Sequence, residues 1–329
     1  MTRGRVLLRV RPLPTSNRAF WQDDLSGYAR RMRPANTWLE RLAYSNVWLA
    51  LTASGFAIAT LFVAGARDIT RADLVAVLLP ALSMYVVYTF DKVVKADPVA
   101  DAQNDPERSA FVEKYKPVLL ALAGVALLVG GGLATVSPGG ARALALFGMP
   151  FPIAYAYGTN VLPPGFRYRR LKDVTGGKSL TVAATWAVVG VTLPLVAAGR
   201  AAPPALHGFL FAWLLARFFV NTVFFDIGDI EGDLAAGTRT IPVVLGEART
   251  YALLEVSVVA SVIVGLQAAA LSPEMLPAVA LVLAAAAYDM WFVREGQRAE
   301  SLAYVCDVVA DGMGVFTGLA ALCAASFSS

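Results

Sequence analysis

Histidine, cysteine and charged residues are scarce in this chain of 329 residues. It has one histidine and two cysteines, and 16% of its residues are charged, whereas 57% are hydrophobic. Soluble domains average about 25% charged and about 45–50% apolar residues, which argues against a soluble enzyme, a nucleic-acid-binding protein and a disordered chain. Cys306 and Cys323 share one apolar run, and on one helix they are roughly 25 Å apart, too far for a disulfide. His207 stands alone, which excludes a multi-histidine metal site. Any chemistry therefore depends on carboxylates, basic side chains and bound ions.

Long apolar runs predict an all-α, polytopic membrane protein. Each run is long enough to cross a hydrocarbon layer of about 30 Å. There are nine such runs of about 20 residues each, at 43–65, 74–94, 117–136, 142–160, 179–198, 205–226, 250–271, 275–293 and 302–325.

Lysine and arginine set the predicted orientation. With a cytoplasmic N-terminus, 23 of the 28 basic residues lie on the cytoplasmic side and 4 on the other, as the positive-inside rule requires. This bias accounts for the net charge of +4 without a nucleic-acid partner. We expect residues 1–42 to be a cytoplasmic tail and 43–329 a single membrane domain. The cell membrane is the expected location, and an Arg-rich transit peptide for an organelle is the alternative.

One acidic cluster has helical spacing. Asp226, Asp229 and Asp233 would share one narrow face of a helix, where like charges repel. Oxygen-only ligands favour Mg²⁺, which prefers one or two carboxylates, water and a substrate phosphate. The cluster therefore predicts a phosphorylated ligand, with Arg239 as a candidate phosphate partner. The alternative interpretation is a solvated, charged loop.

A second acidic segment covers residues 88–111. Its prolines interrupt helix formation, so the spacing of its acids is less informative. A second metal site here would let two groups of carboxylates grip one diphosphate, and a charged cytoplasmic loop is the alternative. Its charged residues include Asp91, Lys92, Lys95, Asp97, Asp101, Asp105 and Arg108.

Polar residues also lie inside the predicted spans. Arg217 precedes Asn221 by one turn, and acids occur at Asp289, Asp307 and Asp311. A charge at mid-membrane costs roughly 2.5–3.5 kcal/mol, so these side chains are expected to face the bundle interior, with Arg217 and Asn221 as candidate substrate-binding residues below the aspartate cluster. Either Asp307 or Asp311 could pair with Arg217 or hydrogen-bond an acceptor, and a structural ion pair and a catalytic role both remain open.

The segment from Asp226 to Gly246 resembles the second aspartate motif of the UbiA-type intramembrane prenyltransferases. The triple-aspartate spacing and the "GTRTIPVVLG" tail both match. The resemblance implies nine transmembrane helices bundled around a central cavity, and Mg²⁺-dependent transfer of an isoprenyl group from a prenyl diphosphate donor to a lipophilic acceptor. It implies that Asp226, Asp229 and Asp233 hold Mg²⁺ and diphosphate. Asn46 lies where the family often has a polar cavity residue.

The chain departs from the family's first aspartate motif. Only Asp91 matches, as a metal-binding and catalytic residue, and Lys95 replaces the last acid. Asp97 and Asp101 are candidate substitutes. We expect Arg108, Lys178 and Arg239 to neutralise the departing diphosphate. Aromatic candidates for contact with an isoprenyl cation are Tyr155, Tyr157, Trp186, Trp213 and Phe225.

Two other functions are compatible with this pattern. The degenerate first motif also suits a non-catalytic relative that binds isoprenoid lipid. A secondary transporter would show Gly/Pro-broken spans in matching places of two halves, which the sequence lacks. Neither the acceptor nor the length of the donor chain follows from the sequence.

Overall fold

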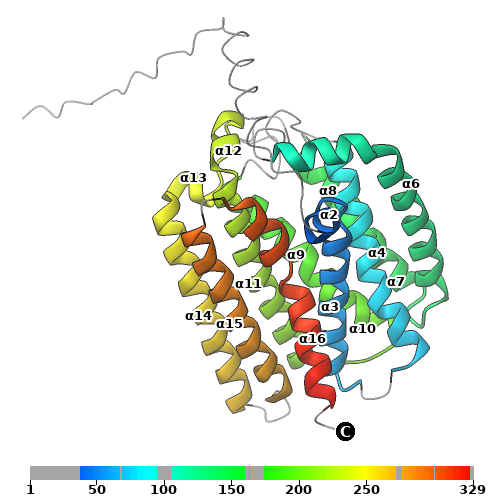
Figure 1. Ribbon diagram of the computed structural model, residues 1–329. Coiled ribbons are helices and arrows are strands. Elements are labelled where there is room, and N and C mark those ends of the chain that lie inside the picture. Colours follow the sequence, from blue (N-terminus) through cyan, green and yellow to red (C-terminus); the bar gives the residue numbers. More distant parts are fainter. Residues whose placement is uncertain are drawn as a thin grey trace, which may run out of the picture. The chain divides into compact units, whose positions relative to one another are not determined.

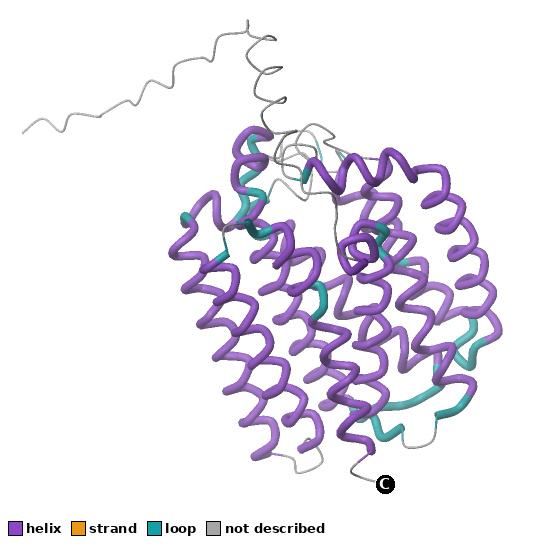
Figure 2. The backbone as a smooth tube through the Cα atoms, viewed as in Figure 1, coloured by secondary structure: helices purple, strands orange, loops and turns teal. Residues whose placement is uncertain are grey.

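Helices make up the regular structure of this protein (Figure 1). The computed structural model describes residues 38–66, 69–94, 105–159, 163, 174–271, 276–299 and 301–326, and within these ranges no strand occurs (Figure 2). The all-α prediction is confirmed. The described residues from Trp38 onward belong to one compact unit. Most of the predicted tail, 1–37, lies outside the described residues.

Six described helices are long and apolar enough to cross a membrane. They are Arg71–Val93, Pro106–Val136, Gly177–Ala197, Pro204–Gly228, Glu247–Gln267 and Val305–Ser326. A bent pair, α2 (Trp38–Tyr44) and α3 (Val47–Val63), makes a seventh if it counts as one span. The runs at 142–160 and 275–293 form α7 (Ala141–Gly148), α8 (Pro150–Gly158) and α15 (Leu276–Arg298), which are not among these. The protein is thus an integral membrane protein, and the predicted count of nine is not confirmed.

The first predicted span is broken at Asn46. α2 and α3 meet at 84°, so residues 43–65 are not one straight helix as predicted. Asn46 adopts φ 64°, a left-handed conformation that asparagine tolerates better than most residues. Its buried amide Nδ2 donates to Thr89 Oγ1 at 3.2 Å. Thr89 belongs to α4 (Arg71–Val94), so Asn46 ties the bend to the next helix.

The third predicted span begins earlier than the apolar run. α6 (Pro106–Val136) starts inside the segment that the sequence favoured as a loop. The Asp105 carboxylate caps it by accepting from the Arg108 backbone N–H at 2.9 Å, and Pro106 occupies the first helical position, where no N–H is needed. Figure 1 shows the first turns of α6 crossing one end of the bundle before the helix turns along it. Arg108 is thereby placed at that end.

Two spans contain π-helical turns. α9 (Gly177–Ala187) continues through η2 (Val188–Thr192) into α10 (Leu193–Ala197), and η4 (Val305–Ala310) precedes α16 (Met313–Ser326). Such turns free backbone carbonyl groups, and side chains of other helices bind them. Thr60 Oγ1, for example, donates to the Gly190 carbonyl at 2.9 Å.

Small residues allow α3 and α16 to pack backbone against backbone. A methyl group on Gly55 would overlap the carbonyl of Gly314, and one on Gly314 would overlap the carbonyl of Thr52. Small residues at such crossings are typical of helix pairs in membranes. The first and last described spans are therefore held in direct contact.

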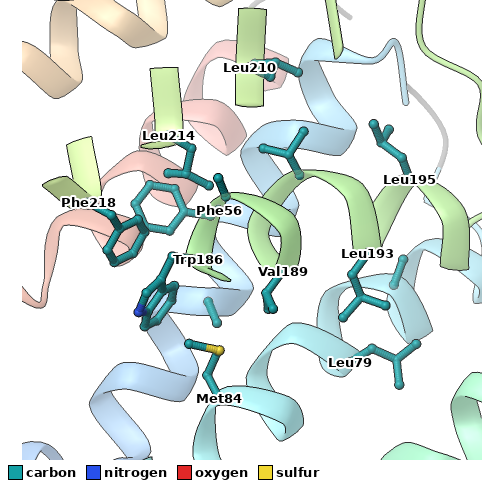
Figure 3. Close-up of a cluster of buried hydrophobic side chains, with 14 of the residues drawn as sticks. Phe56, Leu79, Met84, Trp186, Val189, Leu193, Leu195, Leu210, Leu214 and Phe218 are labelled. Atoms are coloured by element: carbon teal, nitrogen blue, oxygen red, sulfur yellow. The ribbon is translucent and has the colours of Figure 1, made fainter. Parts of the chain in front are cut away.

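Aromatic side chains fill the core between α3, α9 and α11 (Pro204–Gly228) (Figure 3). Trp186 stacks on Phe218 with ring centroids 4.2 Å apart, and Phe56 meets Phe218 edge-on at 5.3 Å. All three side chains are almost completely buried. This packing aligns α9 with α11, so that the start of α9 lies beside the end of α11.

Candidate functional site

Three carboxylates converge on one ammonium group at the end of α11. The Lys178 Nζ lies 2.7 Å from Asp226 Oδ1, 3.7 Å from Asp229 Oδ2 and 3.9 Å from Asp233 Oδ2. The structure thus brings together the three predicted acids and one predicted base. We call these four residues the aspartate–lysine cluster.

The acids do not lie on one continuous helix, which corrects the prediction from their spacing. α11 ends at Gly228 and α12 (Ile230–Ala236) begins after Asp229, whose backbone has φ −95° and ψ 2°. The chain stays tightly wound, because the Asp233 N–H donates to the Asp229 carbonyl at 2.8 Å. Gly237, at φ 72°, then ends α12 in a left-handed conformation that favours glycine. This path keeps Asp233 close to Asp226.

Lys178 reaches the acids from the first turn of α9. Gly176, at φ 74°, leads into that helix. The next side chain, Ser179, donates from Oγ to Asp226 Oδ2 at 3.1 Å. Sequence reasoning missed Ser179, although its position beside Lys178 was the available signal.

The aspartate–lysine cluster carries more negative than positive charge. Asp226 is 1% exposed, and a single ammonium faces three carboxylates. Burial, followed by the neighbouring charges of Asp226 and Asp229, raises the pKa of Asp233 to about 6, although Lys178 opposes the shift. The Asp233 Oδ2 atom is buried without a hydrogen bond to the described residues. Further positive charge would therefore stabilise the cluster.

The donor set suits a hard divalent cation, because it consists of carboxylate oxygens only. The three oxygens already lie within 4 Å of one point, at which the Lys178 ammonium is found. In the described part of the chain, no group of three or more His, Cys, Asp or Glu side chains is arranged as a metal site. The three acids therefore fit Mg²⁺ by donor type, but in this structure the position that they share belongs to the Lys178 ammonium.

A second charged cluster adjoins the first. The Arg108 guanidinium lies 2.8 Å from Asp307 Oδ1 and 3.4 Å from Asp105 Oδ2, and it is within electrostatic range of Asp229. Lys92, which sequence reasoning left out of the site, faces the same acids. The sequence did not indicate that Lys92 belongs to this second cluster, because its position there depends on how α4 packs against α6.

The predicted acids of the first aspartate motif are less well placed for a metal site than those of the aspartate–lysine cluster. Asp91 is exposed near the end of α4, within electrostatic range of Tyr157, which also interacts with Lys178 and Asp226. Asp97 and Asp101 lie outside the described residues. Arg239 is exposed and makes no hydrogen bond or ion pair with the described residues.

Arg217 pairs with neither Asp307 nor Asp311, which corrects both predicted pairings. Its guanidinium donates to both carboxylate oxygens of Asp289, at 2.7 and 2.8 Å, and to Thr317 Oγ1 at 2.8 Å. The guanidinium carbon also lies 5.4 Å from the centre of the Phe56 ring and 5.3 Å from that of the Trp213 ring. Arg217 is only 2% exposed, so its contacts are internal to the protein.

The remaining candidates occupy different environments. Asn46 and Asn221 are buried, and Asn46 Oδ1 and Asn221 Nδ2 make no hydrogen bond within the described residues. Trp186 Nε1 donates a hydrogen bond to the Tyr88 hydroxyl at 2.8 Å. This bond lies at the boundary between the polar side chains and the aromatic core. Tyr155 is 71% exposed on the surface of α8, away from any enclosed position. Both cysteines are free, as predicted.

Comparison with known proteins identifies relatives of this fold. A model of the UbiA prenyltransferase family matches residues 96–305. No curated protein matches the chain. A solved UbiA homolog from Archaeoglobus fulgidus bound to DMAPP and Mg²⁺ has a TM-score of 0.60 and 18% identity, and the match covers 89% of this chain and 98% of that one. The homolog bound to GPP and Mg²⁺ has a TM-score of 0.55 and 17% identity, with 89% and 99% covered.

Proposed function

Because the chain belongs to the UbiA prenyltransferase family, we propose that it transfers an isoprenyl group from a prenyl diphosphate to a lipophilic acceptor within the membrane, with Mg²⁺ as cofactor. The observation that carries this proposal is the convergence of Asp226, Asp229 and Asp233 on one cation position. Solved structures of similar fold hold Mg²⁺ with DMAPP or GPP, which supports the same ligand class here.

Asp226, Asp229 and Asp233, with Asp91 from α4, would hold Mg²⁺. When bound, the ion supplies electrostatic stabilisation of the negative charge on the diphosphate leaving group. The Lys178 ammonium, once released from the carboxylates, is in position to donate hydrogen bonds to diphosphate oxygens. Asp97 and Asp101 remain candidates for the same role.

Basic and amide side chains around the aspartate–lysine cluster would complete donor binding. Arg108 lies at the start of α6 within electrostatic range of Asp229, and Arg239 follows α12 in an exposed position. Asn46 and Asn221 have unsatisfied amide atoms that a substrate could engage. Arg217 would act by positioning, because Asp289 and Thr317 already bind its guanidinium.

The isoprenyl chain would lie below the charged end, among aromatic side chains. The stacked rings of Trp186 and Phe218, and the Phe56 ring that meets Phe218 edge-on, lie on this side of the charged residues. Ring faces stabilise an allylic cation, and an apolar surrounding excludes the water that would hydrolyse it. We further propose that the charged end faces the cytoplasm, since most basic loops lie on that side.

Replacement of one acid of the aspartate–lysine cluster tests this proposal. Purified protein in lipid nanodiscs receives radiolabelled geranyl diphosphate, a membrane lipid extract and Mg²⁺, and release of diphosphate is measured. Asp229→Ala should lower release by about 100-fold or more, and chelation of Mg²⁺ with EDTA should do the same. Glu255→Gln, which changes a partly exposed acid on α14 (Glu247–Leu271), should leave release unchanged. Full activity of Asp229→Ala would contradict the proposal.

A non-catalytic relative that binds isoprenoid lipid is the second candidate. It is favoured by the lysine that already fills the cation position and by the absence, within the described residues, of a group arranged as a metal site. The same experiment separates the two candidates. Binding of geranyl diphosphate by the native protein without release of diphosphate would support the second.

A further inference from the structure

Two contacts between α9 and α11 fix how these helices lie relative to each other. At the charged end, Lys178 pairs with Asp226 at 2.7 Å. Farther along, the Trp186 ring stacks on the Phe218 ring with centroids 4.2 Å apart. On each helix the two contacts are eight residues apart, and in opposite directions along the chain, which corresponds to about 12 Å of helix. The two helices are therefore antiparallel, and the ring stack lies about 12 Å from the aspartate–lysine cluster along both axes.

Two further helices hold the stack in place. From α4, the Tyr88 hydroxyl accepts a hydrogen bond of 2.8 Å from Trp186 Nε1. From α3, the Phe56 ring meets Phe218 edge-on at 5.3 Å. Figure 3 shows the three rings together with Met84 of α4 in one buried cluster. An indole that is both stacked and hydrogen-bonded has one preferred orientation, so Trp186 is a rigid group between these helices.

Beyond the stack the helices are in direct contact. Gly190 lies one turn after Trp186, and a methyl group there would overlap the Leu214 side chain of α11. The Gly190 carbonyl also accepts a hydrogen bond of 2.9 Å from Thr60 Oγ1 of α3. Leu214 is 1% exposed. A chain that extends from the aspartate–lysine cluster along α9 and α11 would therefore meet a closely packed core behind Trp186.

The turn between the cluster and the stack carries smaller side chains. One turn nearer the cluster than the two rings, α9 has Val182 and α11 has Thr222, and both are partly exposed. The Thr222 hydroxyl donates to the Phe218 carbonyl at 2.8 Å, so its polar group is already bound by the helix. Side-chain size and burial thus both increase at the level of Trp186.

We propose that the Trp186–Phe218 stack closes the donor site and limits the donor to two isoprenyl units. This assignment rests on the proposed function. Each isoprenyl unit adds about 5 Å to an extended chain, because carbon–carbon bonds are about 1.5 Å long. Two units fit within about 12 Å, whereas a third would have to displace the indole from Phe218 and Tyr88. The preferred donors are therefore dimethylallyl and geranyl diphosphate, and Trp186 is the residue that excludes longer ones.

A series of donors of increasing length tests this limit. Full-length protein in lipid nanodiscs receives Mg²⁺, a membrane lipid extract and dimethylallyl, geranyl, farnesyl or geranylgeranyl diphosphate, and diphosphate release gives kcat/KM for each. The native protein should use farnesyl diphosphate about 100-fold less efficiently than geranyl diphosphate, because the added unit does not fit a packed site.

A binding measurement gives the same information without catalysis. The thiolodiphosphate analogues of the four donors, which resist cleavage, compete with tritiated geranyl thiolodiphosphate for the native protein. Affinity should fall at the step from geranyl to farnesyl, by a factor similar to the loss of kcat/KM.

Variants on α9 should move the limit in both directions. Trp186→Leu should raise the use of farnesyl diphosphate by about 10-fold or more and change that of geranyl diphosphate little. Trp186→Phe, which keeps a ring but loses the hydrogen bond to Tyr88, should fall between this variant and the native protein. Val182→Phe adds a ring one turn nearer the cluster. It should lower the use of geranyl diphosphate by about 10-fold and leave dimethylallyl diphosphate less affected.

Phe147→Ala is the control for a general loosening of the core. Phe147 is 1% exposed and belongs to the same buried cluster, but it lies on α7 against Gly130 of α6. Its removal should lower the melting temperature while the preference for geranyl over farnesyl diphosphate stays native. A purely structural role of Trp186 would give the same result for Trp186→Leu.

The outcomes separate this limit from the proposed function. Equal use and equal affinity of geranyl and farnesyl compounds by the native protein would overturn the limit, as would an unchanged preference in Trp186→Leu. If Trp186→Leu does not fold, an unchanged preference in both Trp186→Phe and Val182→Phe would overturn it. Absence of diphosphate release with every donor would overturn the proposed function, and the affinities of the analogues would still decide on the limit. Absence of binding by every analogue would overturn both.

Discussion

Lys178 occupies the position that a divalent cation would share with the three carboxylates, which leads to a prediction about stability. Lys178→Met removes the one ammonium beside Asp226, whose side chain is 1% exposed. Breaking a buried ion pair costs about 3–5 kcal/mol. Because Lys178 itself keeps 23% of its side-chain surface exposed, we expect a loss near the lower limit, about 3 kcal/mol, when no divalent cation is present.

Magnesium should compensate for most of this loss. A cation present at a concentration 100 times its Kd stabilises the folded state by about 2.7 kcal/mol. This gain is close to the stability that the substitution is expected to remove. The native protein should gain less, because the cation must displace the Lys178 ammonium from Asp226. Thermal unfolding of the detergent-solubilised protein, in EDTA and in excess Mg²⁺, measures both gains without any dependence on catalysis.

The charge-preserving variant Lys178→Arg is the matched control and should melt close to the native protein in EDTA. Two results would refute the reasoning. One is a Lys178→Met variant as stable as the native protein in EDTA, and the other is an equal loss of stability with and without Mg²⁺. Either would mean that the carboxylates do not depend on a cation at that position.

Two further predictions concern the fold around the site. Arg217→Met should lower stability by about 3–5 kcal/mol, since it leaves the buried Asp289 carboxylate unpaired; adding Asp289→Leu should recover most of it in thermal unfolding, and equal stability of the single and double variants would contradict this account. Asp105→Ala should cost about 1 kcal/mol by removing the cap of α6, whereas Asp105→Ser should keep most of the cap, and equal losses would contradict the capping role.

Much of the fold follows from apolar run length. Each predicted run is mostly helical in the described residues, because apolar residues satisfy their backbone groups in lipid only as helices, although the runs at 43–65, 142–160 and 302–325 are each interrupted. The early start of α6 was also readable, from the pair Asp105–Pro106 that caps it. The break at Asn46 was not, because a left-handed asparagine is stabilised by its contact with Thr89, far along the chain.

The candidate site, like the fold, could be predicted only in part from the sequence. The spacing of Asp226, Asp229 and Asp233 predicted that the three side chains share one cation position, and in the structure all three carboxylates lie within 4 Å of one cationic side chain. Spacing could not indicate that this cation is Lys178, because the pairing depends on how α9 packs against α11. Nor could the sequence alone choose among the three acids within the predicted spans as the partner of Arg217, since the pairing with Asp289 depends on where α15 lies relative to α11.

The glycine contact between α3 and α16 has a consequence for assembly. During synthesis α3 enters the membrane before the described helices that follow it and α16 enters after them, yet the two helices dock with almost no side-chain spacer at Gly55 and Gly314. Asp307 lies in η4, shortly before α16, so its ion pair with Arg108 of α6 can form only after this late segment has inserted beside the earlier helices.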